Sequence, residues 1–135
     1  MPILIHWDAS FSVGNHLLDG QHQKLLHLCN QLAECATERP VDAQFRFHDI
    51  LHQLTQYARQ HFQMEEGMLQ KYDYTGLADQ QAEHGAYEEK MADWAFSATM
   101  DTLDMQEVQR YLAIWWRDHI LITDMQYKPL MENKR

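Results

Sequence analysis

The chain has 135 residues, 45% of them hydrophobic, and a formal net charge of −9. This length predicts a single domain over 1–135 that buries a core without help from disulfides. The acidity excludes nucleic acid as a partner, because neutralising phosphates requires clustered Lys and Arg. It also argues against adsorption to an anionic membrane surface.

The first residues, Met-Pro-Ile-Leu-Ile-His, lack the basic start and long apolar run of a signal peptide. The longest apolar stretches, such as 111–116, fall far short of the ~20 residues of a spanning helix. Cys29 and Cys35 are six residues apart on one expected helix, ~9 Å along its axis, which is too far for a disulfide. We therefore expect reduced thiols and a cytoplasmic protein with no membrane partner.

Hydrophobic periodicity predicts an irregular N-terminal arm over 1–18 and a first helix over 19–36, with Asp19 as its N-cap. Asp42 is the expected cap of a second helix over 43–72. A turn containing Asp and Gly then separates it from the next helical pattern.

The third helix is expected over 77–98, and the fourth over 105–126, where Asp104 begins a capping-box pattern. No stretch alternates apolar and polar residues as a strand does. Short loops between long amphipathic helices predict an all-α protein, an antiparallel up-down-up-down four-helix bundle. The inner faces are expected to carry, among others, Ala95 on the third helix and Ile122 on the fourth.

His61 and Glu65 are four residues apart on the second helix, so their side chains point the same way and can bind one metal or two adjacent metals. Alone, this pair is common. The other three helices add His22, then Gln80 and His84, then His119 and Asp124. Burying six unpaired polar groups at one level would cost roughly 1–3 kcal/mol each, and a metal that takes their lone pairs removes that cost.

The remaining histidines serve as an internal control. Helical phasing turns His48 and His52 roughly 180–220° away from His61, so they should face solvent. His27 is off the stripe of His22, and His6 and His16 fall in the arm. Imidazole suits Fe, Zn, Cu or Ni, so the ligand types alone do not name the metal. Carboxylates that bridge two hard cations favour iron over copper.

The order His, His-x-x-x-Glu, Gln-x-x-x-His, His-x-x-x-x-Asp resembles the hemerythrins, specifically the single-domain bacteriohemerythrins. The likeness extends from the opening stretch 6–14 to the closing stretch 124–131, nearly the whole chain. Several motifs at matched distances make it specific. One position departs, because Gln80 stands where the family usually has a histidine.

The resemblance implies two non-haem iron ions joined by an oxo or hydroxo bridge, and it assigns roles to the six residues. His22 and His61 would bind one iron, His84 and His119 the other, and Glu65 and Asp124 both. His119 and Asp124 are five apart, about 140° round a regular helix. Both can reach the metals only if the helix bends or loosens there.

By the same resemblance, the function is reversible binding of O2, or of another small diatomic or anion, for storage, delivery or sensing, without catalysis. The expected lining of the gas pocket is Leu25, Phe62, Trp115 and Trp116, each one turn or one residue from a ligand. The alternative is a di-iron enzyme reducing peroxide or nitric oxide, favoured by a more open site at Gln80. The histidines also need hydrogen-bond acceptors, for which Tyr87, Glu88 and Tyr111 are candidates.

Overall fold

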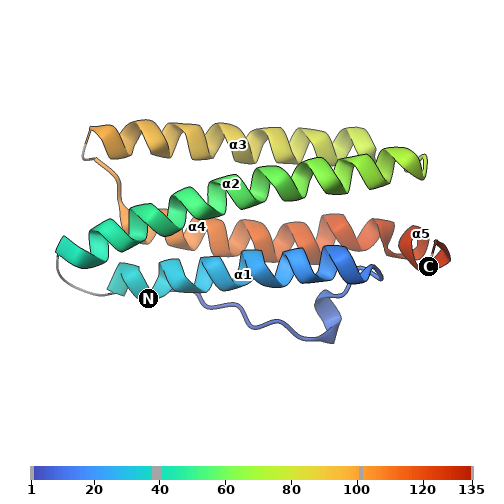
Figure 1. The fold of residues 1–135 in the computed structure, drawn as a ribbon, viewed down its shortest axis with the longest axis horizontal. Coiled ribbons are helices and arrows are strands. Elements are labelled where there is room, and N and C mark those ends of the chain that lie inside the picture. The colour runs from blue at the N-terminus through green and yellow to red at the C-terminus, as the bar shows by residue number, and fades with distance from the viewer. Residues whose placement is uncertain (1, 38–40, 101, 135) are drawn as a thin grey trace.

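The structure is a computed structural model that describes residues 2–37, 41–100 and 102–134. Four long helices run lengthwise, each in the opposite direction to the one before it (Figure 1). They are α1 (His16–Thr37), α2 (Val41–Lys71), α3 (Leu77–Thr99) and α4 (Met105–Asp118). No strand occurs in the described ranges. The expected all-α, up-down-up-down four-helix bundle is confirmed.

The fourth helix does not end as a plain α-helix. After Asp118 it widens into a π-helical segment, η2 (His119–Thr123), then tightens into a 3-10 turn, η3 (Asp124–Tyr127). A short helix, α5 (Lys128–Asn133), follows. The expected loosening of the fourth helix before Pro129 is therefore present, and it lies between His119 and Asp124.

Two of the expected helix starts are wrong. The first helix begins three residues early at His16, and Asn15 accepts a hydrogen bond from the Leu18 backbone. Asp19, already inside the helix, instead accepts from Ser12 and from the Val13 backbone, which fastens the arm to α1. Likewise, α2 begins at Val41, so Asp42 lies inside it.

The other two starts agree with the structure: α3 begins at Leu77, and Asp104 caps α4 by accepting from the backbone N–H groups of Gln106 and Glu107. The arm contains one 3-10 turn, η1 (Ala9–Phe11), and runs along the outside of the bundle (Figure 1). Side-chain amides hold its backbone in place. Asn30 on α1 pairs with both backbone groups of Ile5, and Gln109 on α4 does the same for Ile3.

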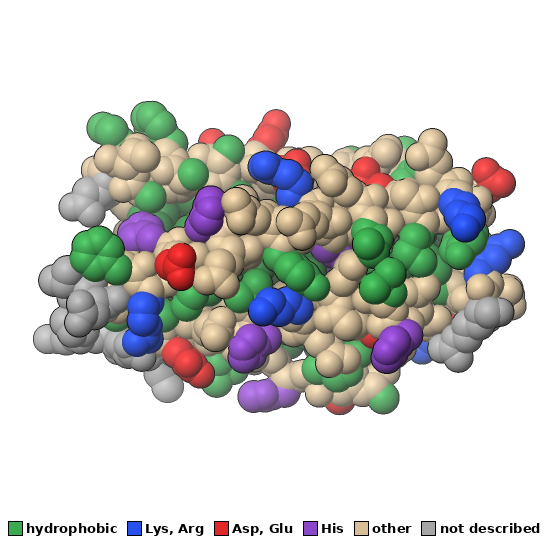
Figure 2. Space-filling model, in the orientation of Figure 1, with side chains coloured by type: hydrophobic (Ala, Val, Ile, Leu, Met, Phe, Trp, Pro, Cys, Tyr) green, Lys and Arg blue, Asp and Glu red, His purple; other side chains and the backbone are tan. Residues whose placement is uncertain are grey.

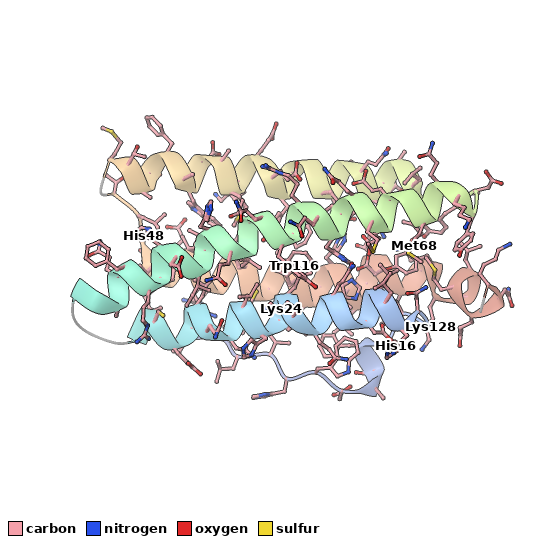
Figure 3. All side chains as sticks on the ribbon, viewed as in Figure 1. His16, Lys24, His48, Met68, Trp116 and Lys128 are labelled. Carbon is pink, nitrogen blue, oxygen red and sulfur yellow. The ribbon has the colours of Figure 1, made fainter. Side chains whose placement is uncertain are left out.

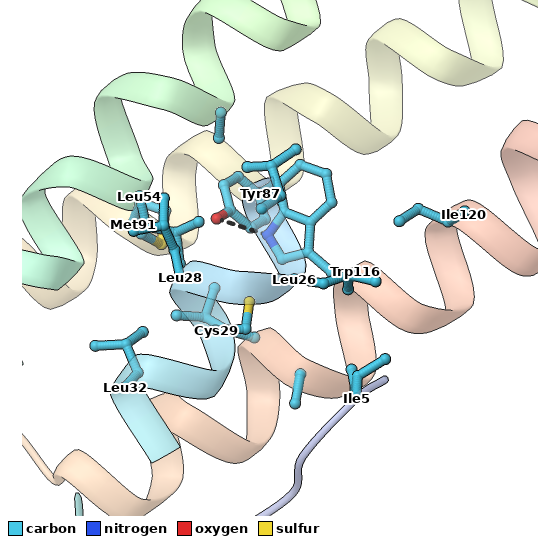
Figure 4. Packing of buried hydrophobic residues seen from close by; sticks show 14 of the residues in the cluster. Ile5, Leu26, Leu28, Cys29, Leu32, Leu54, Tyr87, Met91, Trp116 and Ile120 are labelled. Atoms are coloured by element: carbon cyan, nitrogen blue, oxygen red, sulfur yellow. Dashed lines mark hydrogen bonds between the residues drawn. The ribbon is translucent and has the colours of Figure 1, made fainter. Parts of the chain in front are cut away.

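The core follows the helical stripes with two exceptions. Ala95 is exposed, as is Ile122 at 63% of its surface. The π segment explains the second: its wider turn changes the phase after His119, so Ile120 is buried instead. Figure 4 shows the aromatic centre of this core, where Trp116 and Tyr87 meet. Cys29 and Cys35 are buried and free. Among the described helices, none is long and apolar enough to cross a membrane.

Candidate metal centre

Six polar side chains meet inside the bundle, and all of them were expected from the sequence. Each is at most 2% exposed. They come from α1, α2, α3 and the irregular segments η2 and η3 that follow α4, and they are His22, His61, Glu65, His84, His119 and Asp124. Buried apolar side chains, among them Leu25, Phe62 and Trp116, make up the rest of the core around this polar layer.

Four histidines divide into two pairs at this layer. His22 and His61 have ring centroids 4.8 Å apart, and the Nε2 atoms of His84 and His119 are 3.2 Å apart. Each pair forms, with Glu65, a cluster of three donor atoms within 4.8 Å of one another, as a metal ion requires. Two adjacent clusters share one carboxylate.

Glu65 faces both pairs with different oxygens. Its Oε2 lies 3.6 Å from His22 Nε2 and 3.4 Å from His61 Nε2, while its Oε1 lies 3.0 Å from His84 Nε2. A carboxylate in this position can bind two metals at once, one through each oxygen.

Asp124, in η3, likewise faces both histidine pairs with different oxygens. Its Oδ2 lies 3.2 Å from His22 Nε2, and its Oδ1 lies 3.2 Å from His119 Nε2. The π segment makes this possible, because the Asp124 backbone N–H bonds to the carbonyl of His119, five residues back. A hydrogen bond of that span brings His119 and Asp124 to the same side of the helix, although a regular α-helix would hold them about 140° apart.

Several buried nitrogen and oxygen atoms at the centre lack hydrogen-bond partners within the described structure. They are both ring nitrogens of His22, His61 Nε2, Glu65 Oε1, Gln80 Oε1 and Asp124 Oδ2. Buried polar atoms normally have partners, because leaving one unsatisfied costs roughly 1–3 kcal/mol. Apart from His22 Nδ1, all of these atoms lie at the ends of side chains that point into the centre. Cations at this level would satisfy them, so the residues fit a metal pair.

Without metal, protons carry part of the balancing charge. Burial lowers the pKa of His22, but contacts with Asp124 and Glu65 outweigh it and raise that pKa to about 9. His119 behaves alike: burial opposes protonation, Asp124 favours it, and its pKa is about 9. Burial dominates at His61 and lowers its pKa. Two of these imidazoles must therefore lose protons before they can bind a metal.

Three of the histidines form a hydrogen bond through Nδ1, the ring nitrogen that points away from the centre. Their partners differ from those expected. His61 meets Gln21 Oε1 at 2.6 Å and His84 meets Glu66 at 2.7 Å. His119 meets Glu83 at 2.8 Å, and Thr123 donates to the same carboxylate.

None of Tyr87, Glu88 and Tyr111 is among these partners. The sequence carries a usable signal for the correct ones. Gln21, Glu66 and Glu83 are each adjacent in sequence to a proposed ligand, so each lies beside the inner face of its own helix.

A family model described as the hemerythrin HHE cation binding domain matches residues 13–131. The chain belongs to the hemerythrin family. It is 29% identical to a bacteriohemerythrin of Clostridium acetobutylicum over 124 residues, covering 90% of this chain and 96% of that protein. It is 30% identical to a myohemerythrin of Riftia pachyptila, covering 90% and 89%. A crystal structure of wild-type hemerythrin superposes with a TM-score of 0.87 at 26% identity, covering 96% and 99%.

Within this hemerythrin fold, two further buried side chains hold the carboxylates. The Tyr127 hydroxyl donates to Glu65 Oε2 at 2.8 Å, a contact that sequence reasoning missed. The Gln80 amide nitrogen donates to Asp124 Oδ1 at 2.8 Å. Gln80 is 1% exposed, so it points into the centre from the helical position expected of it.

Three of the four expected lining residues are fully buried beside the histidines. Phe62 stacks on His84 with ring centroids 3.9 Å apart, and Trp116 lies 6.0 Å from His61. Leu25 is buried on α1. The fourth, Trp115, stacks on His119 at 4.4 Å but is half-buried, and it lines a surface cavity of about 320 Å³ that also reaches His119.

The control histidines lie elsewhere. Most of them are exposed: His6, His16, His27 and His52, while His48 is half-buried at the far end of α2 (Figure 3). None of the five belongs to either three-residue cluster of the described chain. His16 is the first residue of α1 rather than part of the arm.

Proposed function

We propose that this hemerythrin-family chain holds two iron ions in its bundle core and binds O2 reversibly, for storage, delivery or sensing. The observation that carries the proposal is the division of oxygens by Glu65 and Asp124. Each carboxylate presents one oxygen to one histidine pair and its other oxygen to the second pair. A single metal would not require both carboxylates to face two ways.

We propose the following ligand roles, which this geometry supports. His22 and His61 would hold one iron and His84 and His119 the other, with Glu65 and Asp124 binding both. When bound, the iron pair with its oxo or hydroxo bridge supplies the two electrons that O2 takes up. Tyr127 and Gln80 hold the two carboxylates by donating to one oxygen of each, which restricts their rotation.

The surrounding side chains make the centre dry. Phe62, Trp116 and Leu25 are at most 2% exposed, and the first two contact His84 and His61 with their apolar rings. A low-polarity pocket admits an uncharged diatomic more readily than a hydrated anion. The cavity beside Trp115 and His119 reaches a proposed ligand from the surface, and we assign it as the entry route.

The test begins with metal analysis of protein purified without added iron, with about two irons per chain as the expected result. The protein is then reduced anaerobically and exposed to air. A visible absorption band that persists in air and vanishes under argon supports reversible binding. Glu65→Ala should lose the pair of metals, whereas His48→Ala on the same helix should keep it. Two irons with an unchanged spectrum in Glu65→Ala would remove this residue from the bridging role.

A second candidate is a di-iron enzyme that reduces peroxide or nitric oxide, and Gln80 favours it. Its amide nitrogen is engaged by Asp124, and its Oε1 has no hydrogen-bond partner in the described chain. An amide oxygen is a weaker donor to iron than an imidazole. The iron held by His84 and His119 would then be more open to water and anions.

Gln80→His separates the two candidates, because it restores the histidine usual in the family on the same helical position. If the open site causes rapid oxidation, this variant should show a longer-lived O2 adduct and a changed azide affinity. Gln80→Leu is the control, because it removes the amide without supplying an imidazole or a carboxylate that could bind iron. Unchanged adduct lifetime and azide affinity in Gln80→His would remove the main support for the enzyme.

A further inference from the structure

A groove of about 340 Å³ lies between α2 and α3, outside the metal centre. Its α2 wall carries His48, His52, Thr55 and Arg59. Spacings of four, three and four put these residues on one helix face, over about 16 Å of its length. In Figure 1, α2 and α3 diverge toward the N-terminal end of α2.

The floor of this groove is apolar, and so is its α3 wall apart from Glu88. Leu51, Met91 and Tyr87 are buried beneath it, and the small side chains of Ala92 and Ala95 leave its mouth open. Figure 2 shows hydrophobic and histidine side chains at the surface over the same end of the molecule. The volume is at the lower end of the ~300–1,000 Å³ found for small-molecule sites.

The polar side chains at the rim are mostly donors. Arg59, His48 and His52 line it, and Glu88 is the one carboxylate among the lining residues. The guanidinium and the two imidazoles can each donate a hydrogen bond to a ligand, against the single carboxylate of Glu88. Arg59 Nε lies 3.9 Å from Glu88 in an exposed ion pair, which holds the guanidinium weakly and leaves the N–H donors of its two terminal nitrogens able to bind another carboxylate.

We propose that this groove binds a small molecule with an extended apolar body and one carboxylate, the chemistry of a medium-chain fatty acid. The apolar body would lie along Leu51, Met91 and Ala95. The carboxylate would take hydrogen bonds from Arg59 at one end, or from the two imidazoles at the other. Binding of such a ligand requires no metal.

The groove is also connected to the metal centre through its floor. The Tyr87 hydroxyl accepts a hydrogen bond from Trp116 Nε1 at 3.1 Å, drawn in Figure 4. The Tyr87 ring contacts Phe62 edge-on at 5.5 Å, and Phe62 stacks on His84. An occupant touching Tyr87 therefore lies two side chains from a predicted iron ligand. It should change tryptophan fluorescence even in metal-free protein.

The experiment titrates decanoate and decanol, below their micelle concentrations, into the full chain by calorimetry and by tryptophan fluorescence. One decanoate per chain is expected, with decanol at least tenfold weaker. Ala95→Leu should abolish binding of both by filling the groove, while Ala86→Leu, exposed on the same helix outside the groove, should not. Arg59→Gln should weaken decanoate about tenfold and leave decanol unchanged. Arg110→Gln is its control.

Each result has a defined meaning, provided that circular dichroism shows the variants folded. Undiminished decanoate binding in Ala95→Leu would overturn the assignment to this groove. Equal binding of decanol and decanoate, with no effect of Arg59→Gln or of His52→Ala, would overturn carboxylate recognition. Failure of decanoate to saturate a single site would overturn the proposal altogether. Because metal-free protein serves for the titration, these outcomes are independent of O2 binding.

Discussion

Replacing Tyr127 by phenylalanine removes one hydroxyl from the buried side of the metal centre and leaves the ring in place. That hydroxyl donates to Glu65 Oε2 at 2.8 Å, and burial raises the Tyr127 pKa well above its ordinary value, so it remains a donor at any working pH. A hydrogen bond to a charged group contributes roughly 1.5–3 kcal/mol. With an unfolding entropy of about 2.1 cal/mol/K per residue, Tyr127→Phe should lower Tm by about 5–11 °C in this chain.

The assay is urea and thermal unfolding followed by circular dichroism, in the presence of a chelator so that metal does not contribute. Tyr72→Phe is the matched control, because Tyr72 is half-buried and its ring lies near two lysine side chains rather than a carboxylate. It should change the free energy of unfolding by less than about 0.5 kcal/mol. Equal stability of Tyr127→Phe and the parent chain would show that Glu65 is held by other groups.

Three further outcomes are expected. Glu83→Ala removes the acceptor behind His119 and should weaken metal binding by about 10–100-fold, measured by competition with a chelator. Metal uptake at pH 7 should release roughly two protons per chain, since Asp124 helps to hold the pKa of both His22 and His119 at about 9 against burial. The release should fade as pH rises above 9, and calorimetry in buffers of different ionisation enthalpy measures it. Asp104→Ala removes the cap of α4 and should cost about 1 kcal/mol of stability in urea unfolding.

Helical spacing predicted most of the buried polar layer, because it decides which side chains of a regular helix share a face. Asp124 was expected there from the family resemblance, since regular spacing would turn it about 140° from His119. His61 and Glu65 are four apart, and the structure places them on the inner face together. The same rule separated His52 from the centre. It failed at Ile122, where the periodicity of a regular helix no longer applies.

The side chains that form hydrogen bonds with the ligands could not be predicted from helical spacing. Gln21 reaches His61 and Glu83 reaches His119, each from a different helix, so their pairing depends on how the helices are set against one another. Tyr127 reaches Glu65 across 62 residues of sequence. Such contacts depend on the separation and rotation of packed helices, which a pattern along one helix does not contain.

The π segment has a consequence for how related chains are compared. In a regular helix, the gain or loss of one residue rotates everything after it by about 100°. Here the widened turn sets the direction of both Asp124 and Tyr127, which meet the same centre from consecutive turns. Substitution of the exposed Ile122 leaves that direction intact, whereas a one-residue gap between 119 and 124 does not. Spacing in this stretch therefore distinguishes a chain that can build the centre from one that only shares the bundle.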